Sequence, residues 1–239
     1  MTLKTILTCT LFTLFVPPTA AQTGETAASN TQENWAVSGL LCLSYIGDLN
    51  DDTRPSVCYN PPVPMLMLGS SWLNGGIKGD RQAQFPLRSG VFRKLAGGFT
   101  LLQVSRNLYQ GIFGVSAGLQ VGGYLYDVAP GYSAEKDGHR VEFVPADNEH
   151  KNDKLSFIMF RMPLMIGAHD RNRLFSLQTG LGLCYTSRPG AQWMLTAGVG
   201  PVTFNYSQNL TPLFKSGDGT NAYPSSFTIG LDILYLLTR

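Results

Sequence analysis

The sequence predicts an all-β fold, an antiparallel up-and-down transmembrane β-barrel of eight to ten strands. Three observations predict it: segments in which apolar and small polar residues alternate, a near absence of charge from those segments, and a division of the connections into short and long ones. Alternation with a period of two puts the two kinds of side chain on opposite faces of a strand. Only 14% of the 239 residues are charged and 26 are glycine, a balance that soluble domains, typically about 25% charged, seldom have.

Residues 1–21 predict a secretory signal peptide. They combine Lys4, an apolar run from Ile6 to Val16, and the small residues Ala20 and Ala21 before the expected cleavage site. The run is shorter than the roughly 18 apolar residues of a membrane helix, and no later run approaches that length. We expect an exported protein, with residues 22–34 as a short N-terminal segment and residues 35–239 as a single barrel domain. An uncleaved N-terminal anchor is the alternative.

Charge and cysteine content limit the classes of partner. The formal net charge of +2 becomes +1 without Lys4, because residues 1–21 contain no acid. Such a balance gives no electrostatic basis for binding nucleic acid. Beyond Cys9, the cysteines are Cys42, Cys58 and Cys184. A Cys42–Cys58 disulfide and packing as small apolar side chains both stay open, since three cysteines make no complete disulfide framework.

Four segments show the alternation most clearly, and none has a helical period. In residues 110–126, QGIFGVSAGLQVGGYLY, the apolar side chains fall on odd positions, and glycine, serine, glutamine and one tyrosine fall on even positions. The other three clear strands are residues 35–45, 174–185 and 225–235. Less regular strands are expected at residues 62–73, 84–95, 99–108 and 154–167.

Residues 193–206 change phase at Gly200-Pro201, where the apolar positions shift by one. A shift of one residue turns every side chain over, so a tight turn or a bulge must lie there. We expect a tight turn joining two short strands. The three long polar connections, residues 46–62, 127–153 and 210–224, then lie on one side of the barrel, and the short ones lie on the other. Outer-membrane barrels have this arrangement.

The lack of charge on the polar face of the strands indicates which environment each face meets. In a soluble sandwich, or in a soluble ligand-binding barrel, one face of each strand meets water and carries charge. Here the polar face carries glycine, serine, glutamine and cysteine. Such residues suit the narrow lumen of a barrel of about eight strands, while the apolar face meets lipid.

Several segments resemble the PorT-like outer-membrane β-barrel domain family of Bacteroidetes-type bacteria. The resemblance rests on GIFGVSAGLQVGGYLYD, KLSFIMFRMPLMIG and FSLQTGLGLCY, followed by FNYSQNLTPLF and SSFTIGLDILYLLTR, and it runs from about residue 99 to the end of the chain. It implies a small closed barrel in the outer membrane, with outer-membrane lipid as its surroundings. Named family members assist protein secretion, so the resemblance implies envelope or secretion-machinery proteins as partners.

The motifs that suggest catalysis or metal binding have structural explanations. Gly114-Val115-Ser116-Ala117-Gly118 matches the G-x-S-x-G nucleophile elbow, but the elbow needs a strand-to-helix turn and this match lies within a strand. His139, His150 and His169 share no metal-ligand spacing. We therefore expect no enzyme, no metal and no cofactor.

Among the charged residues on the expected strands, Arg161 and Asp232 form a candidate pair. Arg161 and Asp232 are expected in the lumen, where they would share an ion-pair network with Arg106, because a charge inside a barrel wall must be paired or hydrated. Gln120 and Gln178 also lie at lumen-facing strand positions. Three functions stay open: a filled barrel with a structural, adhesive, or assembly or secretion-accessory role through its outside loops, a narrow solute channel, and a soluble periplasmic ligand-binding barrel.

Overall fold

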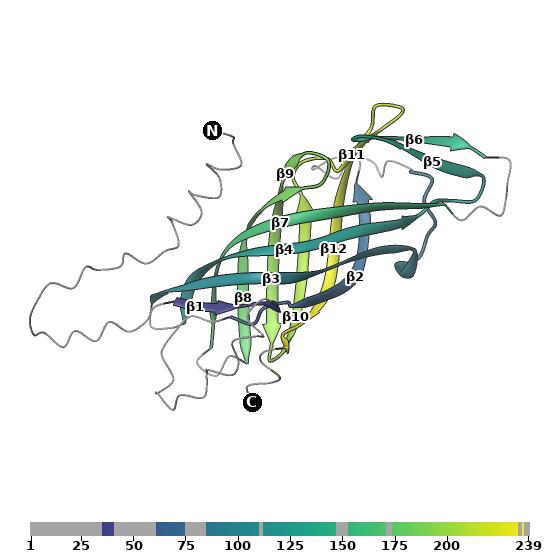
Figure 1. Cartoon of the computed structure of the whole chain (residues 1–239). Helices are drawn as coiled ribbons and strands as arrows, with labels where there is room; N and C mark the ends of the chain where they lie inside the picture. Colours follow the sequence, from purple (N-terminus) through teal and green to yellow (C-terminus); the bar gives the residue numbers. More distant parts are fainter. Residues whose placement is uncertain are drawn as a thin grey trace, which may run out of the picture. The chain divides into compact units, whose positions relative to one another are not determined.

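Eight strands of the computed structural model close into one antiparallel barrel (Figure 1). Each barrel strand pairs with the next one in the barrel, and the last pairs with the first, so the sheet closes on itself. The predicted all-β barrel is confirmed, with eight strands as the count. The strands are β2 (Leu66–Asn74), β3 (Lys94–Tyr109), β4 (Phe113–Asp127), β7 (Lys154–His169), β8 (Phe175–Tyr185), β9 (Pro189–Val199), β10 (Val202–Asn209) and β12 (Asn221–Leu231).

The structure describes residues 35–40, 61–74, 85–109, 112–146, 153–170, 174–233 and 236. All of them belong to one unit, Gln32–Arg239. The predicted signal peptide, the segment 22–34, and the cysteines Cys42 and Cys58 lie outside the described residues.

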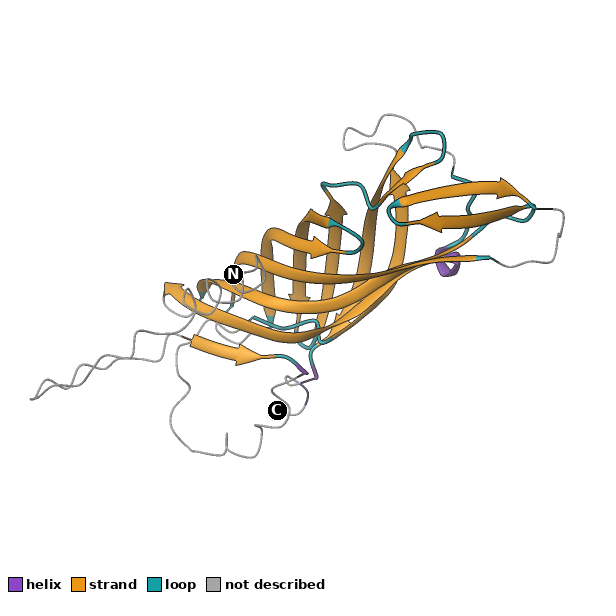
Figure 2. Cartoon of the chain, turned by 45° about the horizontal axis from the view of Figure 1, so that its top comes forward, coloured by secondary structure: helices purple, strands orange, loops and turns teal. Residues whose placement is uncertain are grey.

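The connections define two ends of the barrel. At the long-loop end, chain segments 75–93, 128–153, 186–188 and 210–220 join consecutive strands; at the short-turn end, segments 110–112, 170–174 and 200–201 do so. Figure 2 shows the larger described loops gathered at one end. Gly200, with φ +56°, is the first central residue of the turn between β9 and β10. This is the position at which a two-residue hairpin turn of type II′ requires glycine, and the predicted tight turn is confirmed.

Four further strands of the described residues lie outside the barrel. β5 (Tyr132–Asp137) and β6 (Arg140–Pro145) form a hairpin, and β11 (Phe214–Ser216) pairs with β6 and with β12. The hairpin is thus hydrogen-bonded through β11 to the barrel wall. β1 (Trp35–Ser38) pairs with residues 103–106 of β3, whereas β2 pairs with residues 95–99 of the same strand.

Three sequence-based boundaries are wrong. Of the predicted strand 84–95, only Lys94 and Leu95 lie in a strand, as the start of β3. In the described residues before them, Leu87 makes one isolated bridge and Val91–Arg93 form the 3-10 helix η2, because Pro86 and Gly90, with φ +117°, interrupt the extended chain. The predicted strand 35–45 is, in its described part, the four residues of β1. β12 runs four residues earlier than predicted, from Asn221 to Leu231.

The placement of the long connection 46–62 is also wrong. Its described end, Pro61-Pro62, leads into β2 at the short-turn end, where the N–H of Met65 bonds the carbonyl of Leu231 at 3.0 Å. The prediction counted residues 35–45 as a strand that crosses the barrel, and the short β1 does not cross it. Connections 127–153 and 210–224 do share the long-loop end.

The two faces of the wall follow the predicted alternation. In β8, Phe175, Leu177 and Leu181 are 63%, 57% and 52% exposed, while Ser176 and Gln178 between them are buried. In β3 the alternation reverses at a bulge between Thr100 and Leu102, so that even positions face the lumen before it and odd positions after it.

Candidate functional site

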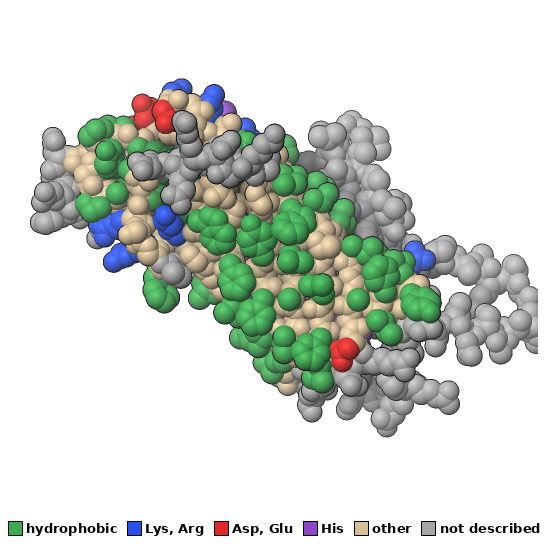
Figure 3. All heavy atoms as spheres, turned by 180° about the vertical axis from the view of Figure 1, so that it is seen from behind, with side chains coloured by type: hydrophobic (Ala, Val, Ile, Leu, Met, Phe, Trp, Pro, Cys, Tyr) green, Lys and Arg blue, Asp and Glu red, His purple; other side chains and the backbone are tan. Residues whose placement is uncertain are grey.

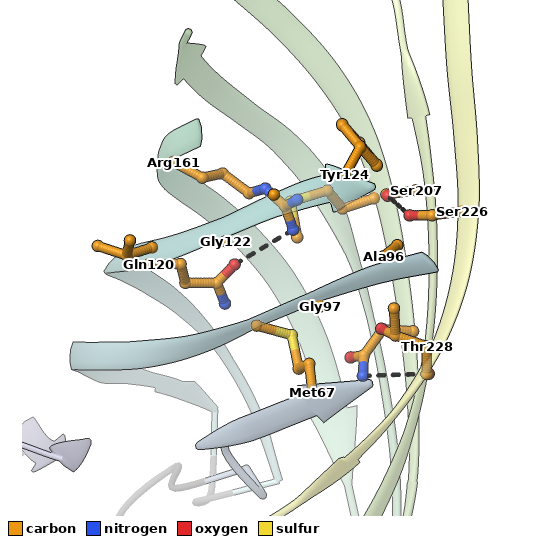
Figure 4. Close-up of a pocket in the computed structure, with 14 residues that line it drawn as sticks. Met67, Ala96, Gly97, Gln120, Gly122, Tyr124, Arg161, Ser207, Ser226 and Thr228 are labelled. Atoms are coloured by element: carbon orange, nitrogen blue, oxygen red, sulfur yellow. Dashed lines mark hydrogen bonds between the residues drawn. The ribbon is translucent and has the colours of Figure 1, made fainter. Parts of the chain in front are cut away.

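The lumen is the candidate site, because the polar residues of the barrel converge there. Thr100, Gln120, Arg161 and Cys184 pair one after another across β3, β4, β7 and β8, so they share the inner face at one level. Gln120 donates a hydrogen bond from Nε2 to the Thr100 hydroxyl at 3.2 Å and accepts one from Arg161 Nη1 at 3.4 Å. These side chains form one row in the middle of the lumen. Figure 4 shows two of them, Gln120 and Arg161, with the hydrogen bond that joins them.

Hydrogen bonds continue from this row toward the long-loop end. Gln192 donates to the Tyr124 hydroxyl at 3.1 Å, and Tyr124 donates to Asn209 Oδ1 at 3.4 Å. All three side chains are buried. The links tie β4 to β9 and β10 across the barrel.

A second group lies toward β12. Thr196 donates to Asn205 Oδ1 at 2.9 Å, and Asn205 Nδ2 donates to Thr203 at 3.2 Å. The hydroxyls of Ser207 and Ser226 are 2.7 Å apart. The cavity left between the two groups is about 20 Å³, enough for about one water molecule.

The short-turn end of the lumen is filled by Pro61–Met65, which we name the proline plug. All five residues are buried. The Asp232 carboxylate accepts the N–H of Val63 at 2.9 Å, and the Thr100 hydroxyl donates to the carbonyl of Pro64 at 2.8 Å. A Cβ on Gly230 would lie 2.7 Å from Pro64 Cβ, so glycine is required there for the plug to fit.

The long-loop end is filled by an apolar cap centred on Phe214. Phe214 is fully buried and its ring lies 5.4 Å from that of Phe157, with the planes 3° apart. The rings of Phe85 and Phe143 lie 5.6 and 6.5 Å from it. These four side chains come from a loop, β6, β7 and β11, so the cap closes the mouth of the barrel and holds the loops together.

Polar contacts form around the outside of the apolar cap. Lys136 lies over the ring of Phe157, 4.4 Å from its centre, and Arg93 pairs with Asp127 at 2.9 Å. At the turn before β12, the N–H of Thr220 bonds the Asp218 carboxylate and holds its pKa below the ordinary value. The cap therefore presents an ordered surface of mixed charge.

The five residues predicted for a lumen network are only partly brought together. Arg161 and Gln120 bond each other, Gln178 accepts a hydrogen bond from Ser116 at 3.2 Å, and Asp232 holds the proline plug. Arg106 is exposed and pairs with Val115 on the outer face. The bulge in β3 explains this position, because it reverses the alternation ahead of Arg106.

Sequence reasoning missed Tyr124, Gln192 and Asn205 as members of the lumen hydrogen bonds. Their inward positions follow from the alternation of β4, β9 and β10, so this signal was present. It missed the proline plug and Phe214 because neither lies in a periodic segment. Ser116 of the G-x-S-x-G match lies within β4 and is buried.

Between its two ends the outer face of the barrel is apolar and uncharged; Arg106 lies on it near the short-turn end of β3. Across residues 66–74, 95–105, 113–126 and 155–168, and across all of β8, β9, β10 and β12, one residue carries a formal charge, and it is the inward-facing Arg161. Figure 3 shows hydrophobic side chains covering the wall, with charged ones toward its ends. The large exposed apolar side chains include Leu66, Leu68, Ile158, Phe160, Leu164, Ile166, Leu177, Leu181, Leu183, Ile229 and Leu231.

Comparison with known proteins gives no relative. No family model matches the sequence, and neither a curated protein nor a solved structure matches it significantly.

The described residues contain neither a helix suited to span a membrane nor a metal-binding cluster. None of the described helices has the length and apolar character to cross a membrane. Within the same residues, no three histidine, cysteine or acidic side chains are grouped so as to hold a metal ion.

Proposed function

We propose that the protein is a small outer-membrane β-barrel that conducts no solute and acts through the cap at its long-loop end. The observation that carries the proposal is the pairing of an outer face that is apolar and uncharged between its ends with a polar, filled interior. A barrel in water would expose charge on its outer face, and the wall has none between its ends. In lipid the same face is favourable, and an arginine or lysine at mid-depth would cost about 2–4 kcal/mol.

The strands are long enough to cross the apolar layer of a bilayer. β8, β9 and β12 have 11 residues each. At about 3.3 Å per residue and a tilt of about 40°, such a strand crosses roughly 28 Å, close to the apolar band of about 25 Å in outer-membrane barrels.

Aromatic side chains mark one border of this band. On the outer face near the long-loop end, the Tyr206 ring lies 6.2 Å from that of Trp72 and 5.7 Å from that of Trp193. Tryptophan and tyrosine gather where a membrane meets water. By the usual orientation, the long loops face outside and the short turns face the periplasm.

The filled lumen favours a structural, adhesive, or assembly or secretion-accessory role over a channel. The proline plug, the middle row and the apolar cap occupy successive levels, and the middle cavity holds about one water molecule. The mixed-charge surface of the cap, which includes Glu135, Lys136, Asp137 and Arg140, is then the surface open to partners. Envelope or secretion-machinery proteins, which the PorT-like resemblance implies, are the partners proposed.

Cell fractionation and gel mobility test the membrane part of the proposal. We expect the protein in the outer-membrane fraction, with a different mobility in detergent before and after boiling. Release with the soluble periplasmic proteins would contradict it and would favour the soluble ligand-binding barrel.

Planar-bilayer recording tests the closed lumen. We expect no stepwise conductance from the purified full-length barrel. Regular single-channel steps that persist after repurification would favour the narrow solute channel instead.

A further inference from the structure

Arg161 places a positive charge in the middle of the lumen with few partners. Its Nη1 reaches Gln120 Oε1 at 3.4 Å, the long end of the hydrogen-bond range, and its buried Nε has no hydrogen-bond partner. Figure 4 shows the side chain extending from β7 toward Tyr124 inside the barrel. A buried charge without a counter-charge is strongly unfavourable, so this site calls for an anion.

The walls of the cavity beside Arg161 supply no carboxylate. They are lined by amides, hydroxyls, glycines and two methionines: Gln120, Asn205, Ser207, Ser226, Thr228, Tyr124, Met67 and Met194. The nearest inward acid along β12 is Asp232, four residues beyond Thr228 and about 13 Å along the strand. Its carboxylate accepts the N–H of Val63 in the proline plug.

The titratable groups next to Arg161 are a phenol and a thiol. Cys184 is its partner across β7 and β8, and Tyr124 lies on the adjacent strand. Both groups are neutral in their ordinary state at neutral pH, so neither supplies the counter-charge.

We propose that the lumen cavity binds one small monovalent anion, chloride, against the Arg161 guanidinium. The cavity, about 20 Å³, admits a particle about as large as one water molecule. This space is too small for polyatomic anions such as phosphate, sulfate or a carboxylate. Chloride is the abundant anion closest to water in size, and it supplies the negative charge that the residues lining the cavity do not offer to the Arg161 guanidinium. The role of the ion is to complete the barrel interior, independent of the function of the cap.

Thermal unfolding in different sodium salts tests the proposal with the purified full-length protein in detergent. At equal ionic strength, chloride and bromide are expected to raise Tm relative to gluconate, which is too large for the cavity. Occupancy at ten times Kd multiplies the folded-to-unfolded ratio by about 11, a Tm rise of roughly 3–6 °C.

Matched variants separate the site from general salt effects. Arg161→Met removes the charge and is expected to lose the difference between chloride and gluconate. Arg106→Met removes an arginine from the outer face and is expected to keep it. An equal response to all salts in the unmodified protein would overturn the proposal, as would a chloride response that survives Arg161→Met.

A crystal grown in sodium bromide gives a reading that does not depend on stability. An anomalous bromide peak in the cavity beside the Arg161 guanidinium is the expected result. Ordered density there without anomalous signal would mean a water molecule and would overturn the proposal.

Discussion

Replacing Phe214 by alanine tests whether the apolar cap holds the long-loop end together. The side chain is fully buried among the rings of Phe157, Phe85 and Phe143. Removing a buried phenylalanine costs about 3–5 kcal/mol, through lost burial and the cavity left behind. At about 1.4 kcal/mol per tenfold change, the open form of the cap becomes more populated by about 2 to 3.5 powers of ten.

Hydrogen exchange of the cap amides measures this change directly. The N–H of Leu213 bonds the carbonyl of Ala222 at 2.8 Å, and that of Lys215 bonds His139 at 2.9 Å. Both amides are expected to exchange faster in Phe214→Ala, while amides of the central barrel strands keep their protection. Phe92→Ala is the matched control, because Phe92 is 87% exposed, and such surface changes usually stay within about 0.5 kcal/mol. Equal exchange in the two variants would refute the role of Phe214.

Two further substitutions probe the wall and the plug. Leu181→Arg, on the outer face of β8, is expected to destabilise the folded barrel in lipid by about 2–4 kcal/mol. Leu174→Arg, just before that strand, is expected to destabilise it by about 0–1 kcal/mol. Denaturant titration in vesicles measures both free energies of unfolding, and equal losses would contradict the assignment of this face to lipid. Gly230→Val would force its side chain against Pro64 and is expected to cost about 1–3 kcal/mol, whereas Gly217→Ala meets only the flexible Glu142 side chain. If Gly230→Val unfolds at the same denaturant concentration as Gly217→Ala, the tight fit of the plug is refuted.

The barrel itself was predictable from the sequence because its signal is periodic. Alternation in residues 110–126 and 174–185 gave the faces of β4 and β8, and the phase change at Gly200-Pro201 gave the turn between β9 and β10. These features depend only on neighbouring residues and on which side of the wall they face.

The filling of the barrel could not be predicted in the same way. The proline plug belongs to no helix or strand and shows no alternation. Its Val63 bonds Asp232, which lies 169 residues away in the sequence. Phe214 lies in a three-residue strand too short to show a period. The position of Arg106 depends on the bulge in β3, which one chain segment does not reveal without its partner. Contacts across the lumen are set by tertiary packing, and periodicity carries no information about them.

The central claim is that the wall faces lipid, and fluorescence quenching at one outer position tests it most directly. In a variant with Trp35, Trp72 and Trp193 replaced by phenylalanine, Leu181→Trp places a single tryptophan on the outer face of β8. In vesicles, strong quenching by lipids brominated near the bilayer centre, with little quenching by aqueous acrylamide, is the predicted result. Quenching by acrylamide alone would show that the face meets water and would contradict the account.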